Sequence, residues 1–253
     1  MRTLRLFIAA AVWAVALRAS AAERVSVAAA ANLTYVLEPL NAAFMASDPG
    51  VSVTSAIGAS GGLVAQINNG APFDVFLSAD LDFPRKLIAA GGAGGSSPVT
   101  FAFGRLVLWT TRADLPLGSV ESAVRDPSVR KVAIANPRTA PYGLAAQEVL
   151  SRLGLTGDAG PKIVVGENIT QTAQFVSSGN ADIGFVALSL VVAPNLKEKG
   201  RWIEIPRSLY PPIAQGAVLT KLGASNPAAR RYLEFLTSKA AREVFARFGY
   251  GLP

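Results

Sequence analysis

Short apolar segments alternate with amphipathic ones along most of this chain. The apolar segment 24–30 (RVSVAAA) predicts a buried strand, and apolar residues at helical spacing over 33–46 predict the helix that follows it. The same order recurs twice, with strands expected over 51–56 and 74–77 and helices over 62–69 and 83–90. Because parallel strands need long crossover connections, this βαβαβα order predicts a parallel sheet with helices on its faces.

A second series of alternating elements follows a Gly/Ser-rich loop at 91–98. We predict strands over 106–110, 132–135, 162–165, 183–186 and 217–219. Helices are expected over 118–125, 143–153 and 170–178, with two more in 226–248. Trp109 and Trp202 are expected in the core. Two such units predict a two-lobed α/β protein with a cleft, one lobe formed by 23–103 plus 216–253 and the other by 104–215.

Residues 1–22 have the pattern of a secretory signal peptide that is cleaved after Ala21 or Ala22. Two arginines precede an apolar run, Leu6–Leu17, which is too short to cross a hydrocarbon core of about 30 Å as a helix. Cleavage would remove three arginines and lower the net charge from +7 to +4. The remaining basic residues are scattered, so the sequence predicts export to the periplasm rather than nucleic-acid binding.

The composition excludes several kinds of chemistry. The chain has no cysteine and no histidine. Disulfides, thiolate catalysis, imidazole metal ligands and the Ser-His-Asp triad are therefore excluded. Only 16% of the residues are charged, which argues against a disordered chain. These absences weigh against an enzyme, and a secreted enzyme on a two-lobed scaffold is the less favoured hypothesis.

Candidate binding residues lie where predicted strands lead into helices. In open α/β sheets, ligands bind at the carboxyl ends of strands, where the next helix presents free N–H groups. Four junctions place small residues or neutral donors at a helix start, namely Ala30–Thr34, Gly58–Gly62, Pro141–Gly143 and Glu167–Thr170. Each alone is compatible with an ordinary helix cap, but four such junctions with glycines that permit close backbone approach indicate a binding site.

The second junction also matches the G-x-S-x-G pattern of hydrolase nucleophile elbows. That mechanism needs a base to take the proton of Ser60, and the chain has no histidine and no lysine close to Ser60 in sequence. The loop is better interpreted as a set of N–H and O–H donors, which favours an anion. Asp74, Asp80 and Asp82 do not form a compact acidic loop, and we interpret them as turn and cap residues rather than ligands of a metal cation.

Three segments carry a resemblance to a known family. The chain is similar to the periplasmic molybdate-binding proteins of ABC importers over VAAAANLTYVLEPLNAAF, IGASGGLVAQINNGAPFDVFLSADLDFPRKL and YLEFLTSKAAREVFARFGYGLP. GAPFDVFLSAD and AREVFARFGY are its most specific parts, and the similarity extends over the mature chain in the same order. The resemblance implies a type II periplasmic binding fold, with two lobes joined by two crossover segments and the ligand in the cleft between them.

The resemblance also implies which residues bind the anion. One version of the family's pocket has a serine in the first loop and a tyrosine from a later loop, where this chain has Asn32 and Ala187. The other version has asparagine in the first loop, serine in the second, tyrosine after a proline in the third and an aliphatic backbone donor in the fourth. This chain resembles the second version, and the site residues carried over are Ala31, Asn32, Ser60, Tyr142 and Ile169. We expect the Tyr142 hydroxyl to donate a hydrogen bond to the anion.

By this resemblance, the protein is expected to capture molybdate, and tungstate as well, as a monomer in the periplasm, and to deliver it to an ABC permease of the inner membrane. Molybdenum would be bound as the oxyanion and not as a metal cation, and the resemblance implies a protein that is not an enzyme and carries no cofactor. A pocket made of donors suits an unprotonated dianion, and helix dipoles can balance its charge without a buried arginine. The alternative is a binding protein for sulfate, phosphate or an organic anion on the same fold.

Overall fold

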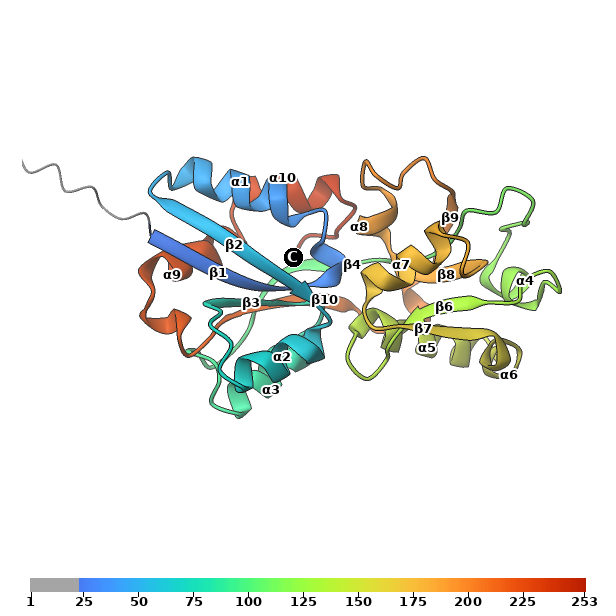
Figure 1. The fold of residues 1–253 in the computed structure, drawn as a ribbon, viewed down its shortest axis with the longest axis horizontal. Helices are drawn as coiled ribbons and strands as arrows, with labels where there is room; N and C mark the ends of the chain where they lie inside the picture. Colours follow the sequence, from blue (N-terminus) through green and yellow to red (C-terminus); the bar gives the residue numbers. More distant parts are fainter. Residues whose placement is uncertain (1–22) are drawn as a thin grey trace, which may run out of the picture.

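The structure is a computed structural model that describes residues 23–253 as two α/β lobes side by side (Figure 1). The predicted signal peptide, residues 1–22, lies outside the described residues. The strands form two five-stranded sheets, in the orders β2-β1-β3-β10-β4 and β7-β6-β8-β5-β9. In each sheet three neighbouring strands are parallel, and antiparallel pairings extend the sheet on one side. The predicted two-lobed α/β fold is confirmed.

The first lobe is built from the first third of the described chain and from its C-terminal end. Its strands are β1 (Glu23–Ala30), β2 (Val51–Gly58), β3 (Val75–Ser78), β4 (Val99–Gly104) and β10 (Ile213–Leu219). Its helices are η1 (Ala31–Leu33), α1 (Leu37–Ser47), α2 (Ser60–Asn68), α3 (Asp82–Ala89), η4 (Gly223–Ser225), α9 (Pro227–Phe235) and α10 (Lys239–Arg247).

The second lobe is built from the middle of the chain. Its strands are β5 (Leu106–Thr110), β6 (Val132–Ala135), β7 (Ile163–Gly166), β8 (Ile183–Ala187) and β9 (Arg201–Glu204). Its helices are α4 (Val120–Arg125), α5 (Pro141–Arg152), α6 (Thr156–Ala159), η2 (Gly160–Lys162), α7 (Ile169–Ser177), α8 (Leu188–Val191) and η3 (Arg207–Leu209). None of the helices described between residues 23 and 253 is long and apolar enough to span a membrane.

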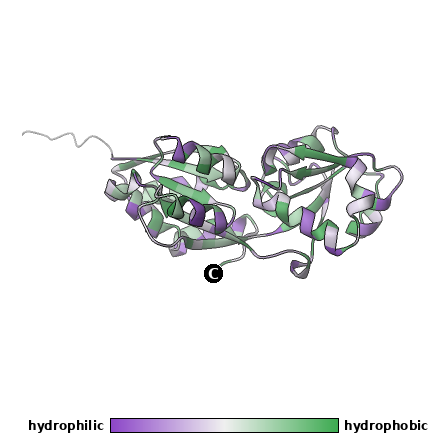
Figure 2. Cartoon of the chain, turned by 90° about the horizontal axis from the view of Figure 1, so that it is seen from below, coloured by the Kyte–Doolittle hydropathy of each residue, from purple (hydrophilic) through white to green (hydrophobic). Residues whose placement is uncertain are grey.

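Helices cover both faces of the first sheet, with α1 and α10 on one side and α2 and α3 on the other (Figure 1). Alternate residues of β1 therefore enter different cores. Val25 and Val27 pack in the cluster formed with α1, α9 and α10, whereas Ala28 packs with Leu63 and Leu87 of α2 and α3. Burial on both faces explains why the strand is an almost continuous apolar run. Hydrophobic residues accordingly concentrate inside each lobe (Figure 2).

Two segments cross between the lobes. The first is the short link between β4 and β5, and the second is the segment between β9 and β10. The first sheet includes Gly104 and residues 213–215, which the sequence analysis assigned to the second lobe. The C-terminal end runs beside the first crossover, since Gly251 and Phe103 exchange two backbone hydrogen bonds of 2.8 Å.

Most predicted elements are present, but the four-residue helices α6 and α8 were not predicted, and there are further differences. β4 and β9, each at the outer edge of a sheet, were not predicted. β9 (RWIE) has no apolar run, whereas β4 (VTFAFG) is mainly apolar and was missed despite that pattern. The helix predicted over 33–46 is divided into η1 and α1 by a turn at 34–36. Trp109 is buried as predicted, but the prediction for Trp202 is wrong: on edge strand β9 it is 39% exposed.

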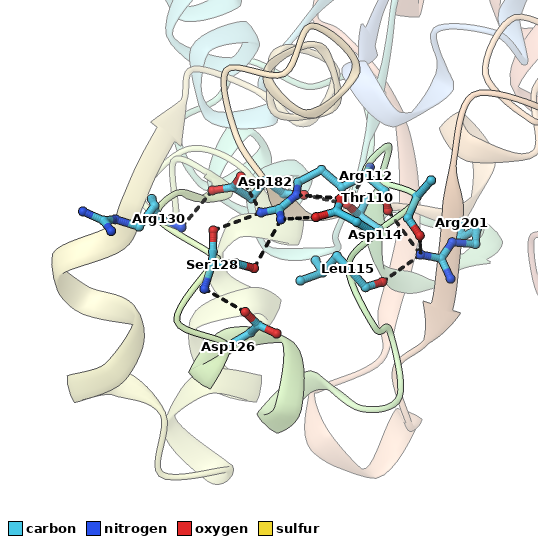
Figure 3. A network of polar contacts seen from close by, with 10 residues as sticks. Thr110, Arg112, Asp114, Leu115, Asp126, Ser128, Arg130, Asp182 and Arg201 are labelled. Carbon is cyan, nitrogen blue, oxygen red and sulfur yellow. Dashed lines mark hydrogen bonds and ion pairs between the residues drawn. The ribbon is translucent and has the colours of Figure 1, made fainter.

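A network of polar contacts in the second lobe ties the end of β5 to the loops before β6 and β8 (Figure 3). The Arg112 guanidinium contacts the carboxylates of Asp114 and Asp182, at 2.6 and 3.1 Å, and donates to the Ser128 carbonyl. Asp182 also accepts hydrogen bonds from the backbone N–H groups of Arg130 and Lys131. These contacts fix the three loops relative to one another.

Candidate functional site

A pocket between the two lobes collects the starts of four helices. It is lined by Ala30, Ala31, Asn32, Gly58, Ala59, Ser60, Ala79, Ala140, Pro141, Tyr142, Asn168 and Ile169. The first seven come from the first lobe and the last five from the second. All five residues predicted as binding residues are therefore in one place, and each is at most 3% exposed.

The strand order explains this convergence. β1 is parallel to β2 and β3, and β6 is parallel to β7, so their carboxyl ends lie at the same edge of each sheet. η1, α2, α5 and α7 begin within six residues of the ends of β1, β2, β6 and β7. The first N–H groups of a helix have no acceptor within the helix and carry the positive end of its dipole. The pocket therefore faces four sets of free donors.

In the first lobe, neither η1 nor α2 has a side-chain cap. The N–H groups of Ala31, Asn32 and Ser60, at the starts of these helices, therefore have no capping acceptor. The Ser60 hydroxyl oxygen accepts a hydrogen bond from the Ala79 N–H at 3.1 Å. This contact holds the side chain in place and leaves the hydroxyl proton free to be donated to a ligand.

In the second lobe, the local sequence selects one donor from each helix. Pro141, the first residue of α5, has no N–H, and the N–H of Gly143 bonds to the Ala140 carbonyl, so Tyr142 provides the free N–H group. At α7, the Asn168 side chain caps the helix by accepting from the next two N–H groups after Ile169, each at 3.0 Å. The N–H of Ile169 is the one that this cap leaves free.

No lysine, arginine, aspartate or glutamate lines the pocket. A buried anion would have its charge balanced by oriented backbone dipoles and a hydroxyl, which need no counter-ion. This arrangement avoids the cost of burying a cationic side chain. Chemically, the pocket can accept a small anion that has several hydrogen-bond acceptors.

The family was identified by comparison with known proteins. The model of a family described as bacterial extracellular solute-binding proteins matches residues 25–251. This chain belongs to that family. The chain is 42% identical over 248 residues to the molybdate-binding protein ModA of Azotobacter vinelandii, covering 98% of this chain and 97% of that one. It is 44% identical over 231 residues to ModA of Rhodobacter capsulatus, covering 91% and 89%.

Solved structures agree with this membership of the solute-binding family. The periplasmic molybdate-binding protein of A. vinelandii superimposes with a TM-score of 0.84 at 37% identity, covering 90% of this chain and 99% of that one. The sulfate-binding protein SubI of Mycobacterium tuberculosis superimposes with a TM-score of 0.71 at 18% identity, covering 90% and 86%. The second likeness shows the shared fold alone.

In this solute-binding protein the Asn32 side chain is already engaged behind the pocket. Its Nδ2 donates to Gln215 Oε1 and to the Tyr250 hydroxyl, both at 2.7 Å. Gln215 Nε2 in turn donates to the carbonyls of Ala79 and Ile213, at 3.2 and 3.0 Å, which fixes the orientation of both amides. With both Nδ2 protons used, the group that Asn32 can offer to an anion is its backbone N–H.

Sequence reasoning missed Gln215 and Tyr250, although Gln215 gave a signal. It is a polar residue in the otherwise apolar strand IAQGAVL, and it is completely buried. Buried polar side chains are nearly always hydrogen-bonded, so such a residue indicates a specific partner. Tyr250 gave no such signal, because a tyrosine near a C-terminal helix is usually only a packing residue.

The donor role expected for the Tyr142 hydroxyl stays a prediction, and the position of this hydroxyl bears on it. It lies against the first crossover, where a side chain at Gly104 would collide with it. Among the described residues it has no hydrogen-bond partner, and burial raises its pKa well above the ordinary value, so it stays protonated. The geometry therefore favours the backbone N–H of Tyr142, rather than its hydroxyl, as the group that faces an anion.

Proposed function

We propose that this protein captures molybdate, and tungstate as well, in the cleft between its lobes and delivers it to the permease of an ABC importer. The observation that carries the proposal is the convergence of four helix starts from both lobes on one buried, uncharged pocket. Relatives with 42% and 44% identity over nearly the whole chain are molybdate-binding proteins, which supports the choice of anion.

The proposed ligand contacts come from five residues. The backbone N–H groups of Ala31, Asn32, Tyr142 and Ile169 and the hydroxyl of Ser60 would donate to the four oxygens of the tetrahedral dianion. Molybdate carries no proton near neutral pH, so it needs donors and no acceptor. Tungstate has the same charge and shape and would use the same donors.

The proposed setting follows from the same argument. We propose that the protein acts as a monomer in the periplasm after removal of residues 1–22, with the permease as its protein partner. We further propose that it has no catalytic activity and no cofactor, and that the oxyanion is its cargo. We propose that the parts that move on binding divide at the two crossovers, with Gly104 and residues 213–215 moving with the first lobe, whose sheet includes them.

The main alternative is another oxyanion, above all sulfate, which has the same charge and shape but shorter bonds. Titration calorimetry of the mature protein against molybdate, tungstate, sulfate and phosphate tests the proposal. We expect molybdate and tungstate to bind with a Kd below about 1 μM and sulfate to give no heat of binding. Binding of sulfate as tight as that of molybdate would favour the alternative, and no binding of any of the four would contradict both.

A further inference from the structure

A pair of threonine hydroxyls connects the lobes beside the pocket. The Thr170 hydroxyl lies 2.8 Å from the Ala31 carbonyl and 2.9 Å from the Thr34 hydroxyl, which itself lies 2.6 Å from the Ala31 carbonyl. Ala31 and Thr34 belong to the first lobe and Thr170 to the second. We call these three groups the threonine clasp.

The Thr170 hydroxyl can donate to the Ala31 carbonyl or to the Thr34 hydroxyl, and either hydrogen bond crosses between the lobes. If Thr170 donates to the Ala31 carbonyl, that bond crosses directly. The carbonyl oxygen has two lone pairs and can accept from Thr34 as well; if Thr170 donates to the Thr34 oxygen instead, that bond also crosses. The clasp is therefore tolerant of how the two protons are arranged.

Threonine hydroxyls in helices commonly donate to a carbonyl of the preceding turn, and the Thr170 hydroxyl does not. Thr172, two residues later, donates back to the Asn168 carbonyl at 3.0 Å, which is an ordinary local contact within a helix. Thr170 is the second residue of α7, and its own N–H is satisfied by the Asn168 cap at 3.0 Å. Its hydroxyl instead reaches across to a residue 139 positions earlier in the chain.

The clasp joins the starts of η1 and α7, which carry proposed ligand donors. Ala31 provides its carbonyl to the clasp, and Thr170 directly follows Ile169. Separation of the lobes would break these contacts, since the partners belong to different lobes. We infer that Thr170 and Thr34 are positioning residues that stabilise the ligand-bound arrangement and slow release of the anion without touching it. This inference rests on the proposed function, because it concerns the lifetime of the same complex.

The test compares Thr170→Val with Thr170→Ser, which keeps the hydroxyl. Because one hydrogen bond is lost, we expect Thr170→Val to raise the Kd for molybdate roughly 3- to 10-fold, mainly through faster dissociation measured by stopped flow. Thr170→Ser should stay within about twofold of the unsubstituted protein. The free energy of unfolding without molybdate should be nearly the same for both variants.

A double-mutant cycle with Thr34→Val then measures the coupling. Thr34→Val alone leaves the Thr170-to-Ala31 bond in place, so we expect it to raise the Kd less than Thr170→Val does. If the unsubstituted protein binds molybdate, two results would contradict the role of the clasp. One is an unchanged dissociation rate in Thr170→Val, and the other is an equal effect of valine and serine at position 170. Failure of the unsubstituted protein to bind molybdate would instead contradict the proposed function.

Discussion

Gly61 of the first lobe donates its backbone N–H to the carbonyl of Thr139 in the second lobe, at 2.9 Å. This contact joins the lobes next to Ser60. A side chain at Gly61 would come within 3.1 Å of the Thr139 Cα and within 2.8 Å of the Phe83 ring. The two lobes can approach this closely because position 61 is a glycine.

Gly61→Ala is therefore expected to weaken molybdate binding about 10-fold or more. The added methyl group would push Thr139 away and lengthen the hydrogen bond between the lobes. The free energy of unfolding should not fall to the same extent, since alanine is the better helix former by roughly 1 kcal/mol. Calorimetric titration together with urea unfolding separates the two effects.

Gly62→Ala provides the matched control, because nothing lies within 4 Å of a side chain at that position of the same helix. It should leave the Kd unchanged and stabilise α2. An equal loss of affinity in both variants would show that the effect comes from the helix and not from contact between the lobes.

Ser60→Ala tests the only side-chain donor of the proposed contacts. A hydrogen bond from a hydroxyl to an anion is worth about 1.5–3 kcal/mol, so we expect affinity for molybdate to fall roughly 10- to 150-fold. The Ala79 N–H also loses its acceptor, which should lower the free energy of unfolding by about 1 kcal/mol. An affinity within twofold of the unsubstituted protein would remove Ser60 from the site.

Tyr142→Phe distinguishes the two roles of this residue. If the hydroxyl donated to the anion, its loss would also weaken binding 10- to 150-fold. Since the hydroxyl lies against Gly104, we expect the Kd to change by less than about twofold. The free energy of unfolding should stay the same or rise, because an unpartnered buried hydroxyl is removed. A large loss of affinity would show that the hydroxyl does donate to the anion.

Closure of the lobes on the anion is expected to bend the chain within 100–105 and 210–217, close to the two crossovers. The chain has no cysteine, so spin labels can be placed on Gln66→Cys and Gln147→Cys, which are exposed on α2 and α5. Molybdate should shorten and narrow the distance distribution between the labels. A pair on Gln66→Cys and Lys239→Cys, both in the first lobe, should not respond. An unchanged distribution between the lobes at saturation would contradict closure.

Asp182 should make stability depend on pH in the acid range. Partial burial opposes ionisation of this carboxyl, but the hydrogen bonds from the Arg130 and Lys131 N–H groups and from Arg112 outweigh burial and lower its pKa below the ordinary 3.8 (Figure 3). A carboxyl with a lowered pKa stabilises the fold above its unfolded-state pKa of about 3.9, and this contribution is lost as pH falls through the folded-state value.

We expect Asp182→Asn to lower the free energy of unfolding by about 1.5–3 kcal/mol at pH 7 and the difference to shrink below about pH 4. Asp158→Asn is the control, because its ion pair with Arg125 is exposed on both sides and should contribute less than about 1 kcal/mol. A difference that stays constant from pH 7 to pH 2.5 would show that the carboxylate charge is not the cause.

The sequence by itself determined the fold class and a set of candidate site residues. Alternating strand and helix patterns require crossovers, and crossovers place the strand-to-helix junctions of each lobe at one edge of its sheet, which made these junctions candidates. The choice of Ser60 and Ile169, which follow strands of different sheets, came from the family resemblance. The absence of histidine and cysteine removed most catalytic alternatives without a structure. Edge strand β9 was not predictable, because half of its environment is solvent and its pattern is correspondingly weak.

Only the tertiary structure decided where the side chains of Asn32 and Tyr142 are directed. The amide of Asn32 is held by Gln215, 183 residues away, and the Tyr142 hydroxyl is directed to Gly104. Thr170 donates to the Ala31 carbonyl, 139 residues away, which no local pattern could indicate. Local patterns report backbone geometry over a few residues, whereas side-chain orientation depends on contacts between segments that are far apart in the sequence.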